Sequence, residues 1–207
     1  MINPWLNVPL TDYEAHMASG AVDQADALSA LFAEVLALCR PASVAVLGVA
    51  GGNGLERIDP ACTQRVVGID LNPDYLLAVR SRFADLAGLE LHHADLSVDR
   101  TAIAPVDLVH AALIFEHAGT ALCLQNALAL VAPSGALSVV LQVPGETSGN
   151  VGSSGIASVS QLASHFALVE PAELTARIAT SGFALIHQAR RTVPAGKQLW
   201  HGVFTRS

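Results

Sequence analysis

The sequence predicts an α/β fold: one three-layer domain whose sheet is mostly parallel and ends in an antiparallel hairpin. Short, continuously apolar runs alternate with segments of helical periodicity, as they do in βαβ units. The last part of the chain holds two strand-like runs around a single turn region. We find no internal repeat and no second domain in the 207 residues.

The composition narrows the class of protein. Hydrophobic residues make up 52% of the chain, so it can bury a large core. A formal net charge of -7 argues against nucleic acid and anionic membrane surfaces as partners. The three cysteines form no CxxC pair, which favours free thiols in a reducing compartment over a metal site. No signal peptide or membrane span is evident, so we expect a cytoplasmic protein.

The first elements can be placed with their boundaries. An apolar stripe predicts a helix over residues 23–38, ended by Pro41, and a buried strand comes next at 44–47. A second buried strand is expected at 65–70. Asn72 is the expected N-cap of the next helix, with Pro73 at its first position. The apolar face of that helix is expected to consist of Leu76, Leu77, Val79 and Phe83.

The rest of the chain continues the alternation. Pro133 and Gly135 are expected to stop a helix at 121–132, and the Gly- and Ser-rich stretch 144–160 predicts an irregular surface loop. Three further strands are predicted at 89–96, 106–114 and 136–143. A helix is predicted at 171–182 and a hairpin at 183–206. We divide the single domain 1–207 into an N-terminal helical cap (1–42), a cofactor-binding core (43–142), and a substrate-side loop with the hairpin (143–207).

A glycine-rich loop, "GVAGGNG", directly succeeds the first strand. Gly48, Gly51, Gly52 and Gly54 lack a Cβ atom, so the backbone can turn sharply and a ligand can approach closely. Ala50 interrupts the dinucleotide pattern GxGxxG. The loop is also not followed by the lysine that a P-loop requires. The loop therefore indicates a nucleoside ligand other than a typical dinucleotide or triphosphate.

Two acids stand at successive strand ends. Asp70 lies 22 positions after Gly48, where a carboxylate can accept hydrogen bonds from a ribose diol. Asp95 ends the third strand and offers a partner for an adenine amino group. Because parallel strands open their carboxyl ends into one crevice, these acids and the loop predict a nucleoside site, although each alone is also common in turns and helix caps.

Taken in order, "VLGVAGGNGLERI", "VVGIDLNPDYL", "HHADL" and "DLVHAALIFEH" resemble the class I S-adenosylmethionine-dependent methyltransferases of the bacterial small-molecule type. The resemblance covers roughly residue 43 to the C-terminus and implies a Rossmann-like fold with a seven-stranded sheet. The segment "NPWLNVPLTDYEAHM" is similar to an N-terminal stretch that closes over the cofactor in some members. In this sequence Val46 stands where the family usually has an acid, and Ala50 replaces the second glycine of the loop.

The resemblance also implies roles for individual residues. The loop would pass under the methionine part and the ribose, Asp70 and its neighbour Leu71 would hold the ribose, and Asp95 with Leu96 would border the adenine. The implied cofactor-binding residues are Tyr13, His16, Met17, Gly48, Ala50, Gly52, Gly54, Asp70, Leu71, Asp95, Leu96, Ala111 and Ala112. No metal is implied.

The implied reaction is methyl transfer from S-adenosylmethionine to a small-molecule acceptor. Such a transfer depends on in-line placement more than on acid catalysis, and it needs a base only for protonated nucleophiles. Glu116 and His117 come after the fourth strand and are the candidates to orient an acceptor or take its proton, although both could simply cap the next helix. Trp5 and Trp200 could line an apolar pocket, but ordinary packing is the commoner role of tryptophan.

Two other function classes remain open at this point. An NAD-dependent oxidoreductase would share the sheet and Asp70, but it should show a fuller glycine fingerprint. A non-catalytic protein with a degenerate nucleoside pocket is the other alternative, motivated by Val46 and Ala50. The sequence leaves the acceptor and the oligomeric state open, with a homodimer as one option.

Overall fold

The protein folds as a single α/β domain around a seven-stranded mixed sheet. The structure is a computed structural model that describes residues 3–20, 22–144, 154–193 and 196–207. The strands are β1 (Ser43–Leu47), β2 (Arg65–Asp70), β3 (Leu89–His93), β4 (Val106–Ala112), β5 (Val131–Val143), β6 (Phe183–Thr192) and β7 (Gln198–Arg206). The helices are η1 (Pro4–Asn7), α1 (Leu10–Ala18), α2 (Ala25–Cys39), η2 (Leu55–Arg57), α3 (Pro73–Arg82), α4 (Phe115–Ala118), α5 (Leu122–Leu130), α6 (Ala157–Ser160), η3 (Gln161–His165) and α7 (Pro171–Ala179).

The strand order is β3-β2-β1-β4-β5-β7-β6. The first five strands pair in parallel, whereas β7 runs antiparallel to both β5 and β6. The predicted parallel sheet with a C-terminal antiparallel hairpin is therefore confirmed. The chain crosses from one half of the sheet to the other between β1 and β4, which is the switch point where open α/β sheets bind ligands.

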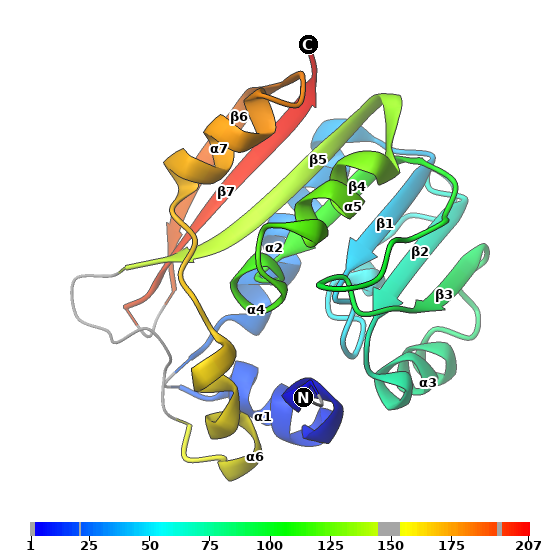
Figure 1. The fold of residues 1–207 in the computed structure, drawn as a ribbon. Helices are drawn as coiled ribbons and strands as arrows, with labels where there is room; N and C mark the ends of the chain where they lie inside the picture. Colours follow the sequence, from blue (N-terminus) through cyan, green and yellow to red (C-terminus); the bar gives the residue numbers. More distant parts are fainter. Residues whose placement is uncertain (1–2, 21, 145–153, 194–195) are drawn as a thin grey trace.

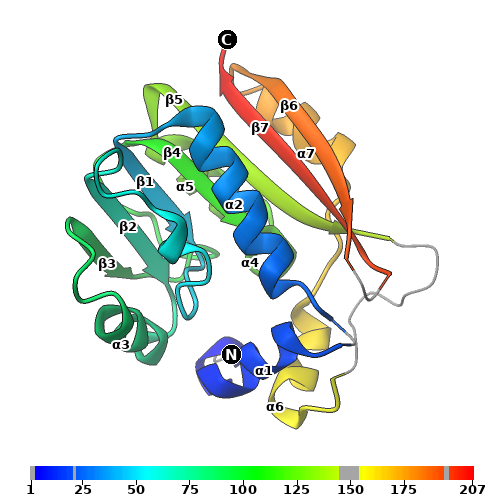
Figure 2. The ribbon, with the colours of Figure 1, turned by 180° about the vertical axis from the view of Figure 1, so that it is seen from behind.

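Helices cover both faces of the sheet and make three layers (Figure 1). On one face, α2 and α3 bury apolar side chains such as Phe32, Val35 and Val79 against the first strands. On the other face, α5 and α7 bury Leu124, Leu130 and other apolar residues. Figure 2, seen from behind, brings α2 in front of the strands. Because both faces are covered, the central strands are apolar throughout, as their sequence indicates.

A separate group of short helices lies at the carboxyl edge of the sheet. In both views the N-terminal segment, η1 and α1, lies beside α6 below the strand ends (Figures 1 and 2). Val8, Val159 and Leu162 form a small apolar cluster that joins the two groups, with Trp5 and Tyr13 packed against it. These segments come from opposite ends of the chain and together cover the switch point.

Most predicted elements agree with the structure, and the differences have local causes. The helix after β2 starts at Pro73, and the side chain of Asn72 accepts a hydrogen bond from the backbone N–H of Asp74, as predicted. The assignment of Leu77 to the apolar face is wrong, because its side chain is 63% exposed. The fourth strand ends at Ala112 rather than at residue 114, since Leu113 adopts a φ of +55° that a strand cannot continue.

The predicted loop 144–160 is also wrong in part, because α6 forms its last four residues. Residues 154–156 are irregular, and residues 145–153 of the predicted loop lie outside the described residues. The helix before β5 ends at Leu130, and the strand begins directly at Val131. Pro133 and Gly135 fall at an irregularity in the pairing of β5 with β4, so they mark a bulge as well as the helix end.

A chain of polar side chains crosses this apolar sheet. The hydroxyl of Ser138 on β5 lies 3.0 Å from Nδ1 of His110 on β4 and 2.9 Å from Nε2 of His201 on β7. Burial lowers the pKa of His110 to about 3 and that of His201 to about 4, each with a further contribution from a neighbouring histidine. Both histidines are therefore neutral in the folded protein at ordinary pH.

This pair predicts acid-dependent stability. In the unfolded chain a histidine takes up a proton below about pH 6.5, whereas the folded protein resists protonation until about pH 3 to 4. The stability contributed by the neutral pair is therefore complete above about pH 6.5 and is lost as the pH falls toward 4. We expect His110→Gln to reduce the pH dependence of the unfolding free energy by up to about 1.4 kcal/mol per pH unit in this window.

Urea unfolding at several pH values between about 4 and about 7.5 measures that slope. The exposed His165 provides the matched control, since His165→Gln removes a histidine outside the sheet. Equal slopes for the wild type and His110→Gln would contradict the assignment.

Candidate functional site

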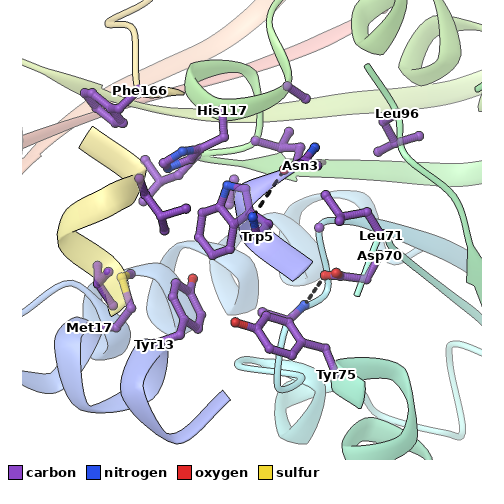
Figure 3. Close-up of a pocket in the computed structure, with 18 of the residues that line it drawn as sticks. Asn3, Trp5, Tyr13, Met17, Asp70, Leu71, Tyr75, Leu96, His117 and Phe166 are labelled. Carbon is purple, nitrogen blue, oxygen red and sulfur yellow. Dashed lines mark hydrogen bonds between the residues drawn. The ribbon is translucent and has the colours of Figure 1, made fainter. Parts of the chain in front are cut away.

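A cavity opens at the carboxyl edge of the sheet, between the strand ends and the N-terminal segment (Figure 3). The ends of β1, β2 and β4 line one side of it, and η1, α1, α6 and η3 line the other. The volume of the cavity is about 130 Å³.

Two residues of the glycine loop line the cavity. Gly48 and Ala50 both adopt the left-handed region, with φ of +68° and +46°. The N–H of Ala50 donates to Oδ2 of Asp70 at 2.9 Å, which holds the turn in place although the residue carries a Cβ atom. Ala50 thus adopts the left-handed conformation at a cost of about 1 kcal/mol.

Gly52 and Gly54 do not line the cavity. A Cβ atom on Gly52 would lie 2.5 Å from Cε2 of Phe83, and one on Gly54 would lie 2.9 Å from Cδ1 of Phe32. Both residues also have a positive φ, +86° and +92°. Glycine at these two positions therefore lets helix-side aromatic rings pack against the loop, and the cofactor contacts that the family resemblance implies for them stay predictions.

Asp70 ends β2 and faces the cavity with a carboxylate that is only 8% exposed. Burial raises its pKa, while N–H donors from Asn72, Ala50 and Leu71 act in the opposite direction. Oδ1 accepts from the N–H of Asn72 at 2.9 Å, and Oδ2 accepts from Ala50. A carboxylate oxygen can accept more than one hydrogen bond, so both oxygens keep capacity for hydroxyl donors. Leu71 lines the cavity next to this carboxylate.

Asp95 and Leu96 line the same end of the cavity, beyond the end of β3. Oδ2 of Asp95 accepts from Nδ2 of Asn3 at 2.9 Å, and Oδ1 accepts from the N–H and the hydroxyl of Ser97. Burial alone would raise the pKa of Asp95, but these hydrogen bonds outweigh it and lower the pKa. Asp95 thus stays ionised and can accept a hydrogen bond from an amino group.

The N-terminal segment is fastened to α3 by several contacts. Nδ2 of Asn72 donates to the carbonyl of Trp5 at 3.0 Å, and the hydroxyl of Tyr75 donates to the carbonyl of Val8 at 2.9 Å. Glu14 pairs with Arg82. These contacts hold the segment over the cavity, next to the two acids.

Trp5 lies between Tyr13 and His117 (Figure 3). Its ring packs edge-on against both, with centroid distances of 5.6 and 4.9 Å. Asn3 and Trp5 both line the cavity. The sequence analysis considered Trp5 for an apolar pocket but favoured ordinary packing, and it did not name Asn3, whose only signal was its position in the segment that resembles a closing N-terminus.

Tyr13, His16 and Met17 line the cavity from α1, and the cofactor contacts that the family resemblance implies for them stay predictions. Burial, with the nearby Asp70 carboxylate, raises the pKa of Tyr13 to about 12, so its phenol stays neutral. Nδ1 of His16 lies 2.8 Å from the hydroxyl of Ser154. Burial and the charge of Lys197 lower the pKa of His16. Lys197, which sequence reasoning missed, also lines the cavity.

At the end of β4 the cavity is lined by Ala112, whereas Ala111 is fully buried in the core. Val46 also packs in the core, so no acid stands at that position of β1. Glu116 is buried, and its Oε1 accepts from the N–H of Gln142 at 2.7 Å. Glu116 is absent from the cavity lining, while His117 belongs to it.

The two candidate acid–base residues differ in their electrostatics. Burial raises the pKa of Glu116 to about 7 and lowers that of His117 to about 4. Within the part of the chain that the structure describes, Oε2 of Glu116 and Nδ1 of His117 have no hydrogen-bond partner. His117 is neutral at ordinary pH and can donate or accept a hydrogen bond at the cavity wall. The described residues include no group of His, Cys, Asp and Glu side chains suited to hold a metal ion.

Comparison with solved structures defines the fold class. The structure of magnesium protoporphyrin IX methyltransferase from Synechocystis PCC 6803, solved with S-adenosylhomocysteine, matches with a TM-score of 0.69 and 12% identity, over 100% of this chain and 98% of that one. The N-methyltransferase NodS from Bradyrhizobium japonicum WM9, also with S-adenosylhomocysteine, matches with a TM-score of 0.64 and 14% identity, over 90% and 87% of the two chains. The chain therefore has the class I S-adenosylmethionine-dependent methyltransferase fold.

The same fold occurs with a different reaction. The [4+2]-cyclase SpnF matches with a TM-score of 0.67 and 12% identity, over 87% of this chain and 80% of that one. No family model and no curated protein matches the sequence. None of the helices in the described residues has the length and apolar character needed to cross a bilayer.

The left-handed conformation of Ala50 generates a prediction. Replacing it with glycine removes a backbone strain of about 1 kcal/mol, so Ala50→Gly should raise the unfolding free energy by about that amount. Urea denaturation measures the change. Ala37→Gly in the exposed part of α2 is the matched control and should lower the stability by about 0.5–1 kcal/mol. A loss of stability in Ala50→Gly similar to that of the control would contradict the strain at this position.

Proposed function

We propose that the protein transfers a methyl group from S-adenosylmethionine to a small-molecule acceptor. The observation that carries this proposal is the buried carboxylate of Asp70, which ends β2, lines the cavity and is oriented by the N–H of Ala50 in the loop after β1. A ribose diol offers two donors, and a carboxylate only accepts, so the two match.

The other residues of the acidic end fit the same ligand. Asp95 offers an ionised acceptor to an adenine amino group, with Leu71 and Leu96 as apolar neighbours. Gly48 and Ala50 bring their backbone close to the cavity, where a methionine chain would pass. When bound, S-adenosylmethionine supplies an electrophilic methyl group on its sulfonium.

The chain's own contribution to the reaction is placement and the exclusion of water. Trp5, Tyr13 and Phe166 give the cavity an apolar, largely aromatic wall that keeps a small acceptor dry. We assign an orienting role to His117, because a neutral imidazole with a pKa of about 4 is a weak base but a good hydrogen-bond partner. Glu116 would act on the acceptor only indirectly, through the end of β5, since it bonds to the backbone of Gln142.

Two alternatives define what the experiment must distinguish. An NAD-dependent oxidoreductase would need a loop that admits a pyrophosphate, and the loop here lacks the dinucleotide pattern at Ala50. A protein that holds the cofactor without transferring its methyl group would share every cofactor contact, and the core position of Val46 supports it, because that strand carries no acid for the amino group of the methionine. The test must therefore measure methyl transfer as well as binding.

Calorimetric titration with S-adenosylmethionine, S-adenosylhomocysteine and NAD provides the first test. We expect saturable binding of the first two and none of NAD, because the cavity offers acceptors for one nucleoside and no phosphate-binding loop. Mass spectrometry of small acceptors incubated with the cofactor would then detect a gain of one methyl group. Binding of NAD alone would contradict the proposal. Binding of the first two ligands without methylation of any acceptor would favour the non-catalytic alternative.

Removal of the Asp70 carboxylate tests the nucleoside assignment. We expect Asp70→Ala to weaken S-adenosylhomocysteine binding by about 1.5–3 kcal/mol, which is about 10- to 150-fold in Kd, because charged hydrogen bonds are lost. Asp85→Ala, at an exposed position after α3, is the matched control and should bind as the wild type does. Circular dichroism of both variants checks that the fold is kept. Unchanged affinity in a folded Asp70→Ala would overturn the assignment.

A further inference from the structure

The cavity has ends of opposite charge. Asp70 and Asp95 lie at one end, where β2 and β3 stop. His16 and Lys197 belong to the other end, close enough together that the charge of Lys197 lowers the pKa of His16. The acids are accounted for by a nucleoside, whereas nothing in the proposed cofactor contacts uses the lysine.

Lys197 is unusual among lysines in being only 3% exposed. In the part of the chain that the structure describes, its ammonium group forms no hydrogen bond and no ion pair, although the carbonyl of the residue accepts from the N–H of Val193. Burying an ammonium group without a partner is unfavourable, and burial lowers the pKa of this lysine. A cation kept at such a cost beside a cavity indicates an anionic ligand.

The place of Lys197 in the sheet separates it from the nucleoside contacts. It directly precedes β7, where Gln198 pairs with Val143 at the end of β5. Strand β7 lies three positions from β1 in the sheet order, which corresponds to about 14 Å at about 4.8 Å per strand. The glycine loop comes directly after β1. Strands β4 and β5 therefore lie between the strand that carries the loop and the strand that Lys197 precedes.

Much of the remaining lining is apolar or aromatic and includes Trp5, Leu113, Val159 and Phe166. Its polar members include the neutral His117 and the hydrogen-bonded pair Gln24 and Gln142. A ligand that fills this part of the cavity and reaches the lysine would have an apolar or aromatic body and one negatively charged group.

We propose that Lys197 binds an anionic group of the methyl acceptor, so that the substrate is a small apolar or aromatic carboxylate. The word "acceptor" in this inference rests on the proposed function, but the anion site itself stands on Lys197, which lines the cavity, is 3% exposed as a residue and forms no side-chain hydrogen bond or ion pair in the described part of the chain. Lys197 positions the acceptor, and the methyl group is received elsewhere on the molecule.

The experiment uses matched pairs of probes that differ in charge: benzoate and benzamide, salicylate and salicylamide, cinnamate and cinnamamide. Each is titrated calorimetrically into protein saturated with S-adenosylhomocysteine. We expect each carboxylate to bind about tenfold or more tightly than its amide in the wild type, since a charged hydrogen bond is gained. Lys197→Arg should keep this preference, and Lys197→Met should lose it. Lys197→Met should fold, because methionine replaces an unpaired buried charge by an apolar side chain of similar length.

Arg191→Met is the matched control. Arg191 lies on β6, next to the same hairpin turn, and pairs with Glu34 outside the cavity. The substitution removes one positive charge from the hairpin and changes no residue that lines the cavity, so the preference for carboxylates should persist. Equal binding of acids and amides by the wild type, a preference that survives in Lys197→Met, or no binding of any carboxylate at millimolar concentration would overturn the proposal.

Two further outcomes separate this inference from the proposed function. If Lys197→Met weakens the binding of S-adenosylhomocysteine itself, the lysine holds the carboxylate of the cofactor and the inference fails while the function stands. If the wild type binds no S-adenosylhomocysteine, the proposed function fails. The same probe pairs titrated into the free protein would then still decide whether Lys197 forms an anion site.

Discussion

The hydrogen bond between Asp70 and the N–H of Ala50 joins the two strands on which the site depends. It links the end of β2 to the loop after β1, and it fixes a left-handed turn at a residue that disfavours one. The second oxygen of the same carboxylate holds the N–H of Asn72, whose side chain caps α3. One buried charge thus sets the loop, the strand end and the start of a helix. Such a charge is tolerable because backbone donors surround it.

The sequence predicted the parts of the fold that depend on interactions between residues close together in the chain. Strand β2 has the predicted boundaries, and Asn72 with Pro73 starts α3 as expected, because capping and the fixed φ of proline act within a few residues. The strand order agrees with the alternating elements, since right-handed crossovers leave few arrangements. Leu77 was misjudged because its exposure depends on where the sheet ends beneath α3, which the helix itself does not encode.

The residues alone indicated lining positions of the candidate site where chemistry and strand ends coincide, and the family resemblance added Tyr13, His16 and Met17 on α1. Asp70 and Asp95 could be found because an acid after a buried strand must emerge at the carboxyl edge. Gly52 and Gly54 resemble ligand contacts in sequence, but their missing Cβ atoms make room for Phe83 and Phe32, which are distant along the chain. Lys197 carried no local signal, because it reaches the cavity through the pairing of β7 with β5. Asn3 had only its place in the N-terminal segment as a signal, and its bond to Asp95 links residues far apart in the chain. Residues of this kind become visible only once long-range contacts are known.

The N-terminal segment connects the acidic end of the cavity to its aromatic wall. The carbonyl of Trp5 is bonded to Asn72, two residues from Asp70, while the ring of Trp5 packs against His117. Asn3 adds a second bond, to Asp95. Because one short segment makes both sets of contacts, a shift of its backbone would also move the ring of Trp5. In the proposed function, the residues that would hold the nucleoside are thus joined through this segment to the aromatic residues that would face the acceptor.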